Sequence, residues 1–365
     1  GRVAVAGGQV HQPPLSQQVE RPAVGLREGL DIMPRLITLD AVFPQGADVE
    51  IEDIAAELSE MQLFVVPVTR RLMQRPNRAY LDEIPFALEH NIPVLQPAKL
   101  KDPEFLARLK ALKADMFVVV AFRMLPEEVW RMPRLGTFNL HAALLPQYRG
   151  AAPINWAVIN GEKLTGVTSF MIDKNIDTGA IILREESRIG PDDTAGDVHD
   201  RLMKLGSEVV LKTVEGIVER NVETRVQRSF IQGAEVLKPA PKLTPELLNI
   251  DWTDTAGHIR NLIRGLSPYP AAFTMMQKGD QAPVQMKIYR ADTFEGSAAP
   301  GTVLSDGKTY LHIAAADALL SIRELQLSGK KRMSVEEFLR GFRDPEDWKA
   351  LCGTSKDEIA RLKEK

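Results

Sequence analysis

The stretches DMFVVVAF (115–122) and GTFNLH (136–141) decide the fold class. The first is a continuous apolar run, which is typical of a strand buried on both faces of a parallel sheet. The second contains Asn139 and His141, separated by one residue. Because successive side chains of a strand point to opposite faces, these two polar side chains are predicted to share one face. The sequence therefore places a polar pair at the end of a buried strand.

The residues around these strands alternate between helical and extended patterns. Apolar residues at helical spacing predict a helix over 103–114 and a long amphipathic helix over 194–219, with Thr194 as its N-cap. Further strands are predicted over 166–172 and 180–189. This alternation predicts an α/β domain, Rossmann-like, with a mostly parallel sheet, over residues 84–219.

The pattern changes after this domain. Residues 220–245 are polar, contain proline and lack a clear period, which predicts a linker. In residues 246–343, a helix over 255–266 precedes short strands separated by turn residues. That spacing predicts a second domain, a small C-terminal β-barrel of OB-like form. Residues 344–365 are predicted to form a helical tail.

The first 83 residues are atypical, and they stand where the first βα units of the catalytic domain are expected. All 19 lysines lie at or beyond Lys99, so this segment has none. The stretch 34–44 could supply a first strand, 49–62 a helix and 63–68 another strand. Divergence, or a frameshift upstream of about residue 84, would each explain the composition.

Composition narrows the class of protein. The chain has 365 residues, of which 44% are hydrophobic and 26% charged, and a net charge of −3 argues neither for nor against nucleic acid. Cys352 is the single cysteine, which excludes an intramolecular disulfide and a cysteine metal site and fits a reducing compartment. No apolar run approaches membrane-spanning length. We therefore expect a cytoplasmic protein without membrane contact, and a monomer.

The polar pair suits proton transfer at a sheet edge. Ligands of open α/β sheets bind at the carboxyl ends of strands. His141 could move protons near neutral pH, and the amide of Asn139 could donate to a developing oxyanion. Asp177 lies in the tight turn NIDTGA (175–180) and could fix the histidine tautomer, while Gly179 lets the backbone bend. Taken singly, each signal is more often structural. The set has no nearby serine or cysteine nucleophile, which indicates direct group transfer.

Joined in order, FNLHAALLPQYRG (138–150) and IDTG (176–179) resemble the core of the folate-dependent formyltransferases. That family carries an Asn-X-His, then Ser-Leu-Leu-Pro and Tyr/Trp-Arg-Gly, then Asp-Thr-Gly at a spacing similar to the 36 residues between His141 and Asp177. Ala143 stands where the family often has serine, which removes a supporting hydroxyl.

The C-terminal part indicates which members of this family the chain resembles. Residues 240–274 and 299–341, which include GKKRMSVEEFLRG (329–341), are similar to the C-terminal domain of the family members that formylate initiator methionyl-tRNA. Glycinamide ribonucleotide formyltransferases are shorter and lack this domain. The resemblance covers residues 84–343.

The resemblance implies transfer of the formyl group of 10-formyltetrahydrofolate to the α-amino group of initiator methionyl-tRNA, without a metal. It implies a catalytic set of Asn139, His141 and Asp177. It also implies a folate site formed by Phe122, Leu125, Pro126, Leu144, Leu145, Pro146 and Gly179. Candidate phosphate contacts to the tRNA are Lys238, Lys242, Lys330, Lys331 and Arg332.

Two alternatives stay open. The family's Gly-Thr-Pro-X-Phe-Ala and Gly-Arg-Gly-Lys segments are not found in residues 1–83. A catalytically impaired relative that binds tRNA or folate without transfer is therefore one alternative. A sugar-amine N-formyltransferase is the other, and the C-terminal resemblance disfavours it.

Overall fold

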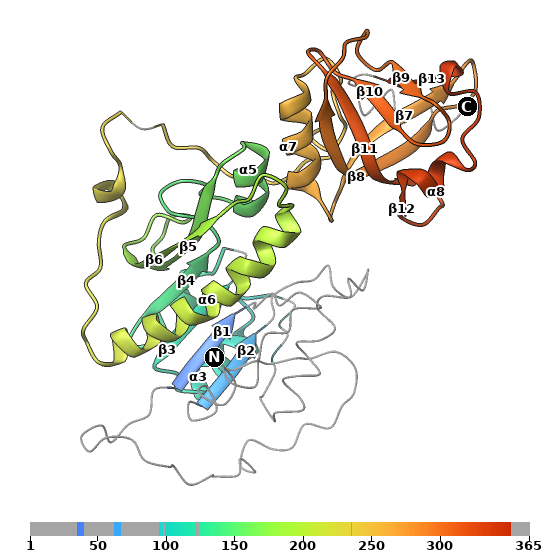
Figure 1. The fold of residues 1–365 in the computed structure, drawn as a ribbon. Helices are drawn as coiled ribbons and strands as arrows, with labels where there is room; N and C mark the ends of the chain where they lie inside the picture. The colour runs from blue at the N-terminus through green and yellow to red at the C-terminus, as the bar shows by residue number, and fades with distance from the viewer. Residues whose placement is uncertain are drawn as a thin grey trace. The chain divides into compact units, whose positions relative to one another are not determined.

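A computed structural model of the chain describes residues 99–120, 124–234 and 236–351, together with Leu95, Pro97 and the backbones of two upstream strands. Two compact units make up the chain (Figure 1). The first contains the described residues up to Pro146, Gly166–Glu185 and Leu202–Val236, and the second contains Gln147–Thr165, Glu186–Arg201 and the residues from Leu237 onward. Within the described residues, no helix is long and apolar enough to cross a membrane.

A six-stranded sheet forms the centre of the first unit, in the order β2-β1-β3-β4-β5-β6. The strands β2, β1, β3 and β4 are mutually parallel, whereas β5 runs antiparallel to β4. The sheet is therefore mixed, within the predicted α/β class. The strands are β1 (Arg35–Leu39), β2 (Gln62–Val66), β3 (Met116–Val120), β4 (Thr137–His141), β5 (Leu164–Met171) and β6 (Ile181–Arg188).

Strand β3 is buried on both faces, as its apolar run predicts. Phe117 and Val119 pack in a cluster with residues of α3 (Pro103–Ala111) and α4 (Glu127–Trp130). The alternate residues Met116 and Val118 pack with Val214 of α6 (Ala195–Val218). Because neighbouring strand residues face opposite ways, the helices cover both faces of the sheet.

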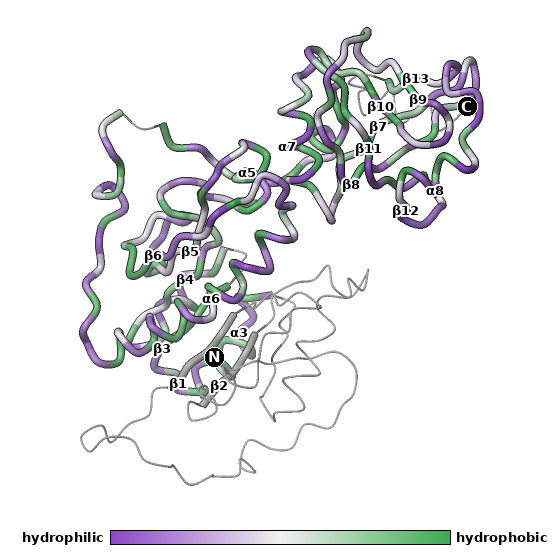
Figure 2. Tube along the Cα trace, viewed as in Figure 1, coloured by the Kyte–Doolittle hydropathy of each residue, from purple (hydrophilic) through white to green (hydrophobic). Residues whose placement is uncertain are grey.

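Helix α6 begins where its sequence predicts. The backbone N–H and the hydroxyl of Thr194 both donate to Asp197 Oδ2, at 2.8 and 2.6 Å, and the Asp197 N–H donates back to Thr194 Oγ1 at 3.2 Å. These reciprocal bonds satisfy N–H groups that the first turn of a helix cannot pair internally. Hydrophobic and hydrophilic segments alternate along α6 in Figure 2, as expected for a helix with one apolar face.

The second unit contains a nearly closed antiparallel β-barrel, as predicted, with strand order β13-β7-β8-β11-β10-β9. A bridge between Thr302 and Lys349 links the two ends of this order, and the Ala350 N–H donates to the Gly301 carbonyl at 2.9 Å. The strands are β7 (Ala272–Lys278), β8 (Val284–Phe294), β9 (Val303–Ser305), β10 (Leu311–Ala314), β11 (Leu319–Leu327), β12 (Met333–Ser334), which pairs with β11, and β13 (Trp348–Leu351).

Helix α7 (Ala256–Leu266) supplies much of the barrel core. Its residues Ile259 and Ile263 are buried in one cluster with Ile288 and Ile322, and fully buried Trp252 belongs to the same cluster. The Thr255 hydroxyl accepts from the His258 N–H and caps the helix, at the predicted start. The remaining helices are α5 (Pro153–Ile159), η3 (Gln227–Phe230), α8 (Val335–Leu339) and η4 (Pro345–Asp347).

The predicted helical tail is wrong in its described part. After the turn η4, residues Trp348–Leu351 form β13 and pair with β7. The Trp348 ring stacks near Phe342, with ring centroids 5.4 Å apart, and Ala350 is buried in the barrel core. This burial favours a strand that completes the barrel over an exposed helix. Residues 352–365 lie outside the described part of the chain.

A hydrogen-bonded network in the second unit joins two distant segments. The Tyr148 hydroxyl and Lys238 Nζ each donate to Glu162 Oε1 at 2.6 Å, and the Tyr148 N–H donates to the Lys238 carbonyl at 2.7 Å. Burial, and then the bond to Glu162, raise the pKa of Tyr148 well above its usual value. Burial also pushes the pKa of Glu162 upward, but the bonds from Lys238 and Tyr148 outweigh it and lower that pKa.

This network predicts a loss of stability at high pH. The pKa of Tyr148 is higher in the folded than in the unfolded protein, so the unfolded state loses the phenol proton first as the pH passes 10.0. The stability that this pKa difference contributes to the free energy of unfolding is therefore complete below pH 10.0. It declines above that pH, by at most about 1.4 kcal/mol per pH unit. Urea unfolding of wild type and Tyr148→Phe at pH 8 and about 10.5 measures it. We expect the wild type to lose more stability than the variant, and equal losses would contradict the assignment.

Candidate active site

Strand β4 carries Asn139 and His141 to the end of the parallel strands. Val119 of β3 is the register partner of Asn139, and Thr168 of β5 is the partner of His141. Both polar residues are 6% exposed. Because register partners in adjacent strands point to the same face, Asn139 lies on the face of β3 that α3 and α4 cover. The predicted shared face and the predicted position at the strand end are both found.

Asp177 comes from the connection between β5 and β6. The side chain of Asp173 supports this turn on both sides of Asp177, since Oδ1 accepts from the Asn175 N–H at 2.8 Å and from the Thr178 hydroxyl at 2.9 Å. Asp177 itself adopts a left-handed conformation with φ of 53°. A Cβ at Gly179 would lie 1.6 Å from the Met171 carbonyl oxygen, so only glycine fits there.

The structure brings the predicted set together. Nδ1 of His141 lies 3.9 Å from Oδ2 of Asp177, and their side chains are 7% and 14% exposed. This distance is longer than a hydrogen bond, but it places the carboxylate beside the ring nitrogen that it could orient. Hydrogen bonds at catalytic sites are often long until substrate binds. The pair can therefore hold and release a proton at a largely buried position.

Asn139 has an amide atom that no described residue hydrogen-bonds. Oδ1 is buried and has no hydrogen-bond partner among the residues that the structure describes. Leaving a buried polar atom unpaired costs about 1–3 kcal/mol. Amide oxygen and nitrogen occupy nearly equivalent positions, so a flip presents the NH₂ group at the same place. Asn139 can therefore bond a carbonyl oxygen or an amine of a bound molecule.

Thr168 supports the turn that follows β4. Its hydroxyl donates to the Ala143 carbonyl at 2.6 Å and accepts from the Leu145 N–H at 3.1 Å. Ala143 stands where the resembling family often has a serine, so this turn receives its hydroxyl from β5 instead. No local pattern indicates this contact, because Thr168 lies 23 and 25 residues from its two partners.

The predicted folate residues divide into core and turn positions. Leu125 packs in the cluster of β3, α3 and α4, and Pro126 is the N-cap residue of α4. Leu145 is fully buried with Phe170 and Ile181. Leu144 is half-buried and Pro146 buried in the same turn, and Gly179 lies in the Asp177 turn. Phe122 lies outside the described residues.

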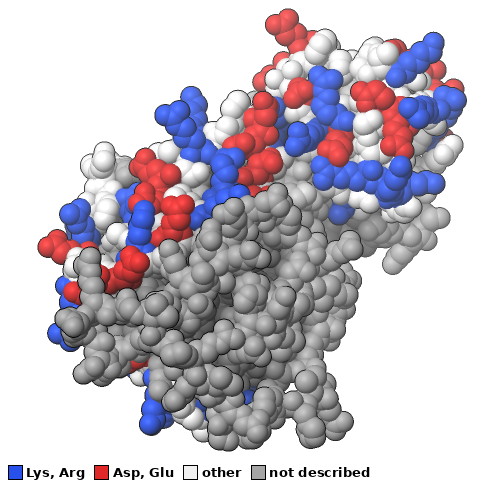
Figure 3. Space-filling view, turned by 60° about the horizontal axis from the view of Figure 1, so that its bottom comes forward, with Lys and Arg blue, Asp and Glu red and all other residues white. Residues whose placement is uncertain are grey.

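The predicted tRNA-binding residues all lie in the second unit, and several already have partners. Lys238 pairs with Glu162 at 2.6 Å and Lys331 with Glu337 at 2.9 Å. Arg332 donates two bonds of 2.6 Å to Glu324 and lies over the Tyr289 ring at 4.2 Å. Lys242 and Lys330 are exposed. Figure 3 shows basic and acidic side chains interspersed on the face in view.

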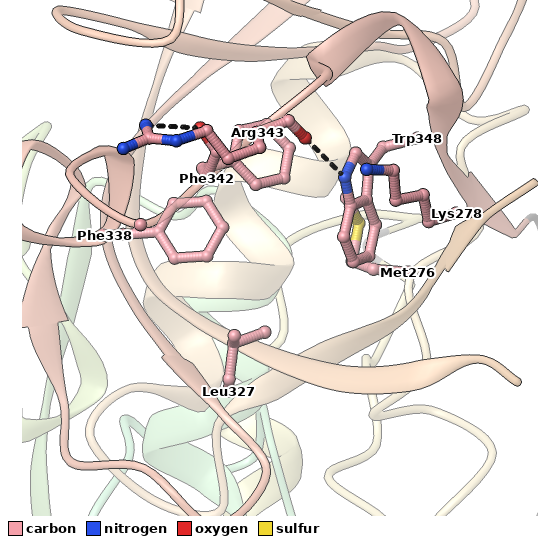
Figure 4. A pocket seen from close by; sticks show the side chains of 8 residues that line it. Met276, Lys278, Leu327, Phe338, Phe342, Arg343 and Trp348 are labelled. Carbon is pink, nitrogen blue, oxygen red and sulfur yellow. Dashed lines mark hydrogen bonds between the residues drawn. The ribbon is translucent and has the colours of Figure 1, made fainter. Parts of the chain in front are cut away.

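A pocket of about 240 Å³ lies in the second unit, and none of the predicted site residues lines it. Aromatic rings form part of its wall, and the Trp348 indole N–H donates to the Arg343 carbonyl at 3.1 Å (Figure 4). Its lining residues are Met276, Lys278, Leu327, Phe338, Gly341, Phe342, Arg343 and Trp348. The pocket therefore belongs to the barrel and to none of the predicted catalytic or folate positions. Among the described residues, no group of three His, Cys, Asp or Glu could hold a metal ion.

Comparison with known proteins identifies the class. Residues 45–214 match the family model described as Formyl transferase, and residues 242–343 match that of the Formyl transferase C-terminal domain. The α/β unit with its polar set and the C-terminal barrel are therefore those of a formyl transferase. The match begins at residue 45, upstream of residue 84 where the resemblance was placed, so part of the atypical segment also matches the family.

Close relatives identify the family within this class. The methionyl-tRNA formyltransferase of Azobacteroides pseudotrichonymphae genomovar. CFP2 is 52% identical over 259 residues, or 70% of this chain and 80% of that protein. That of Flavobacterium johnsoniae is 52% identical over 258 residues, with the same shares. The chain belongs to the methionyl-tRNA formyltransferase family.

Solved structures show the same fold at low identity. WlaRD, a sugar 3N-formyl transferase crystallised with dTDP and 5-N-formyl-THF, has a TM-score of 0.56 and 18% identity, covering 82% of this chain and 100% of that one. The N-formyltransferase from Helicobacter canadensis, in complex with folinic acid and dTDP-3-aminofucose, gives a TM-score of 0.56 and 18% identity over 80% of this chain and 99% of that one.

Proposed function

We propose that this chain transfers the formyl group of 10-formyltetrahydrofolate to the α-amino group of initiator methionyl-tRNA. The observation that carries the proposal is the grouping of Asn139, His141 and Asp177 at one buried site, with His141 Nδ1 3.9 Å from Asp177 Oδ2. The identity of about half with methionyl-tRNA formyltransferases over most of the chain supports the choice of amine.

Attack on the formyl carbon requires charge stabilisation and two proton movements. The amine nitrogen forms a bond to the formyl carbon, and the carbonyl electron pair moves to oxygen. Neutral His141 can take the proton that the attacking amine loses, and the amide of Asn139 and the imidazolium so formed are suited to stabilise this oxyanion. Collapse re-forms the carbonyl and breaks the bond to the folate nitrogen. His141 then gives its proton to the folate nitrogen and returns to the neutral form.

Asp177 acts through His141 in this scheme. A carboxylate beside an imidazole can hold the ring in one orientation and tautomer. Both side chains are largely buried, where charges are screened less than at a surface. The half-buried Leu144 and the turn at Gly179 would hold the co-substrate through apolar and backbone contacts, with Leu125, Pro126, Leu145 and Pro146 shaping the wall behind them.

The tRNA would be held by phosphate contacts to the second unit. Lys242 and Lys330 are exposed and best placed for this role. Lys238, Lys331 and Arg332 would have to exchange carboxylate partners for phosphate. Such contacts set affinity and register without reading sequence.

The direct test is to incubate the wild-type chain with 10-formyltetrahydrofolate and charged initiator tRNA, and to measure formyl-methionine after hydrolysis of the ester. We expect formyl-methionine from charged initiator tRNA and none from a dTDP-linked amino sugar. Formylation of the sugar amine alone would overturn the proposal in favour of a sugar N-formyltransferase. Salt-dependent tRNA binding without transfer would instead identify a binding protein.

A further inference from the structure

We infer that Gln227 is a positioning residue that holds Asp177 in its working orientation. This inference rests on the proposed function, because it assigns a task to Asp177. The side-chain Nε2 of Gln227 donates to the Asp177 carbonyl at 2.8 Å and to the Gly179 carbonyl at 3.0 Å. One amide group thus bonds both carbonyls that flank Thr178, and Gln227 is only 4% exposed.

The Asp177 turn needs such support. The left-handed conformation of Asp177 is unfavourable for a residue with a Cβ, by about 1–2 kcal/mol in general. Asp173 bonds Asn175 and Thr178, which lie on either side of Asp177. Gln227 bonds the carbonyl of Asp177 itself, and therefore fixes the peptide group next to the carboxylate-bearing side chain.

Gln227 is itself held firmly to the same sheet. It begins η3, in the region that the sequence predicts as a linker. Just before it, Arg225 exchanges two backbone hydrogen bonds of 2.8 Å with Ile181 of β6. At the other end of η3, the Phe230 ring packs against the Leu145 cluster, and the Arg184 guanidinium lies 4.8 Å from its centroid. The segment 225–230 is therefore fixed to the sheet and can hold the β5–β6 connection in place.

The distance between His141 and Asp177 makes the reaction sensitive to how segment 225–230 holds the turn. At 3.9 Å the carboxylate is just outside hydrogen-bond range of Nδ1, so a small shift of the turn changes whether the bond can form. Misplacement of a reacting group by about 1 Å can lower a rate by about 100-fold. Loss of the Gln227 amide should therefore lower turnover through Asp177, with little effect on substrate binding.

The test is a double-mutant cycle in the full chain with Gln227→Leu, Asp177→Asn and the double variant. We expect Gln227→Leu to lower kcat about 10- to 100-fold with KM for both substrates within about 2-fold. In the Asp177→Asn background, Gln227→Leu should lower kcat by less than about 2-fold. An equal fold decrease in kcat in wild type and in Asp177→Asn would overturn the inference. An unchanged kcat in Gln227→Leu would overturn it too.

A matched control separates positioning from general destabilisation. Thr213→Val removes a fully buried hydroxyl that bonds Ser169 at 2.8 Å and the Val209 carbonyl at 2.6 Å. Ser169 is the register partner of Leu140, so this contact lies on the opposite face of the sheet from the polar pair of β4. It should lower thermal stability while kcat keeps its wild-type value below the melting temperature. If Thr213→Val lowered kcat as much as Gln227→Leu, the effect would be structural and the positioning role would be overturned.

A readout without substrates keeps this inference separate from the proposed function. In NMR spectra recorded without substrates at one fixed pH, the ring resonances of His141 should move in Gln227→Leu relative to wild type, in the same direction as in Asp177→Asn, because both variants change what lies beside Nδ1. Thr213→Val should leave these resonances at their wild-type positions. Unchanged His141 resonances in Gln227→Leu would overturn the positioning role, whereas wild-type inactivity on methionyl-tRNA would overturn only the proposed function.

Discussion

Replacement of His141 by alanine is expected to lower kcat/KM for formyl transfer by about 10²- to 10⁴-fold, the range that a general acid or base contributes. His141 is the side chain at this site that can both stabilise the oxyanion as an imidazolium and carry a proton to the folate nitrogen. Its environment is largely closed to water, with 7% of the side chain exposed, so solvent replaces it poorly. Steady-state transfer assays at saturating folate measure the effect.

His199→Ala is the matched control for this prediction. His199 lies on α6 beside Asp200, with its side chain 32% exposed and Nδ1 3.3 Å from Asp200 Oδ1. It thus shares a carboxylate neighbour with His141 but not the site, and its loss should leave kcat/KM unchanged. Thermal unfolding of both variants shows whether each is folded at the assay temperature. An active, folded His141→Ala would show that the histidine has no part in the reaction.

Features that depend on residues close together in the chain could be predicted from the sequence. The apolar run of β3, the alternation in β4 and the capping of α6 at Thr194 depend on residues close together in the chain, and the structure contains all three. The grouping of the three candidate residues was predictable because Asn139 and His141 are separated by one residue on a strand, Asp177 sits in a glycine turn, and their order and spacing resemble those of the formyltransferases. The first two signals follow from strand and turn geometry.

The sequence could not predict contacts that join distant segments. Gln227 lies 50 residues from Asp177, in a polar stretch whose composition indicates a linker. Its function depends on the docking of η3 against β6, which no local pattern encodes. Arg332 similarly belongs to a basic run that suggests phosphate binding, yet its guanidinium is bonded to Glu324 across a strand pair. The β13 strand was missed because its partner β7 is far away in sequence.

Asn139→Ala should separate activity from stability. Removal of one oxyanion donor typically costs about 10²- to 10³-fold in kcat, so the rate of transfer should fall by that factor while the folate and tRNA KM values change little. The same substitution removes a buried amide whose Oδ1 has no partner among the described residues. We therefore expect no loss of thermal stability, although ordinary truncation of a buried side chain lowers it.

The stability of Asn139→Ala should be unchanged because two effects on the free energy of unfolding oppose each other. Removal of the unsatisfied amide stabilises the fold, and the cavity left behind destabilises it. An unpaired buried polar atom costs about 1–3 kcal/mol, and its removal recovers that energy against the packing lost. Thr168→Val is the contrasting variant, since its hydroxyl bonds both Ala143 and Leu145 and its loss should lower the melting temperature. If Asn139→Ala were destabilised as strongly as Thr168→Val, the amide would have a structural partner. A stable, inactive Asn139→Ala would instead mean that the fold keeps an unfavourable group at this position because the reaction needs it.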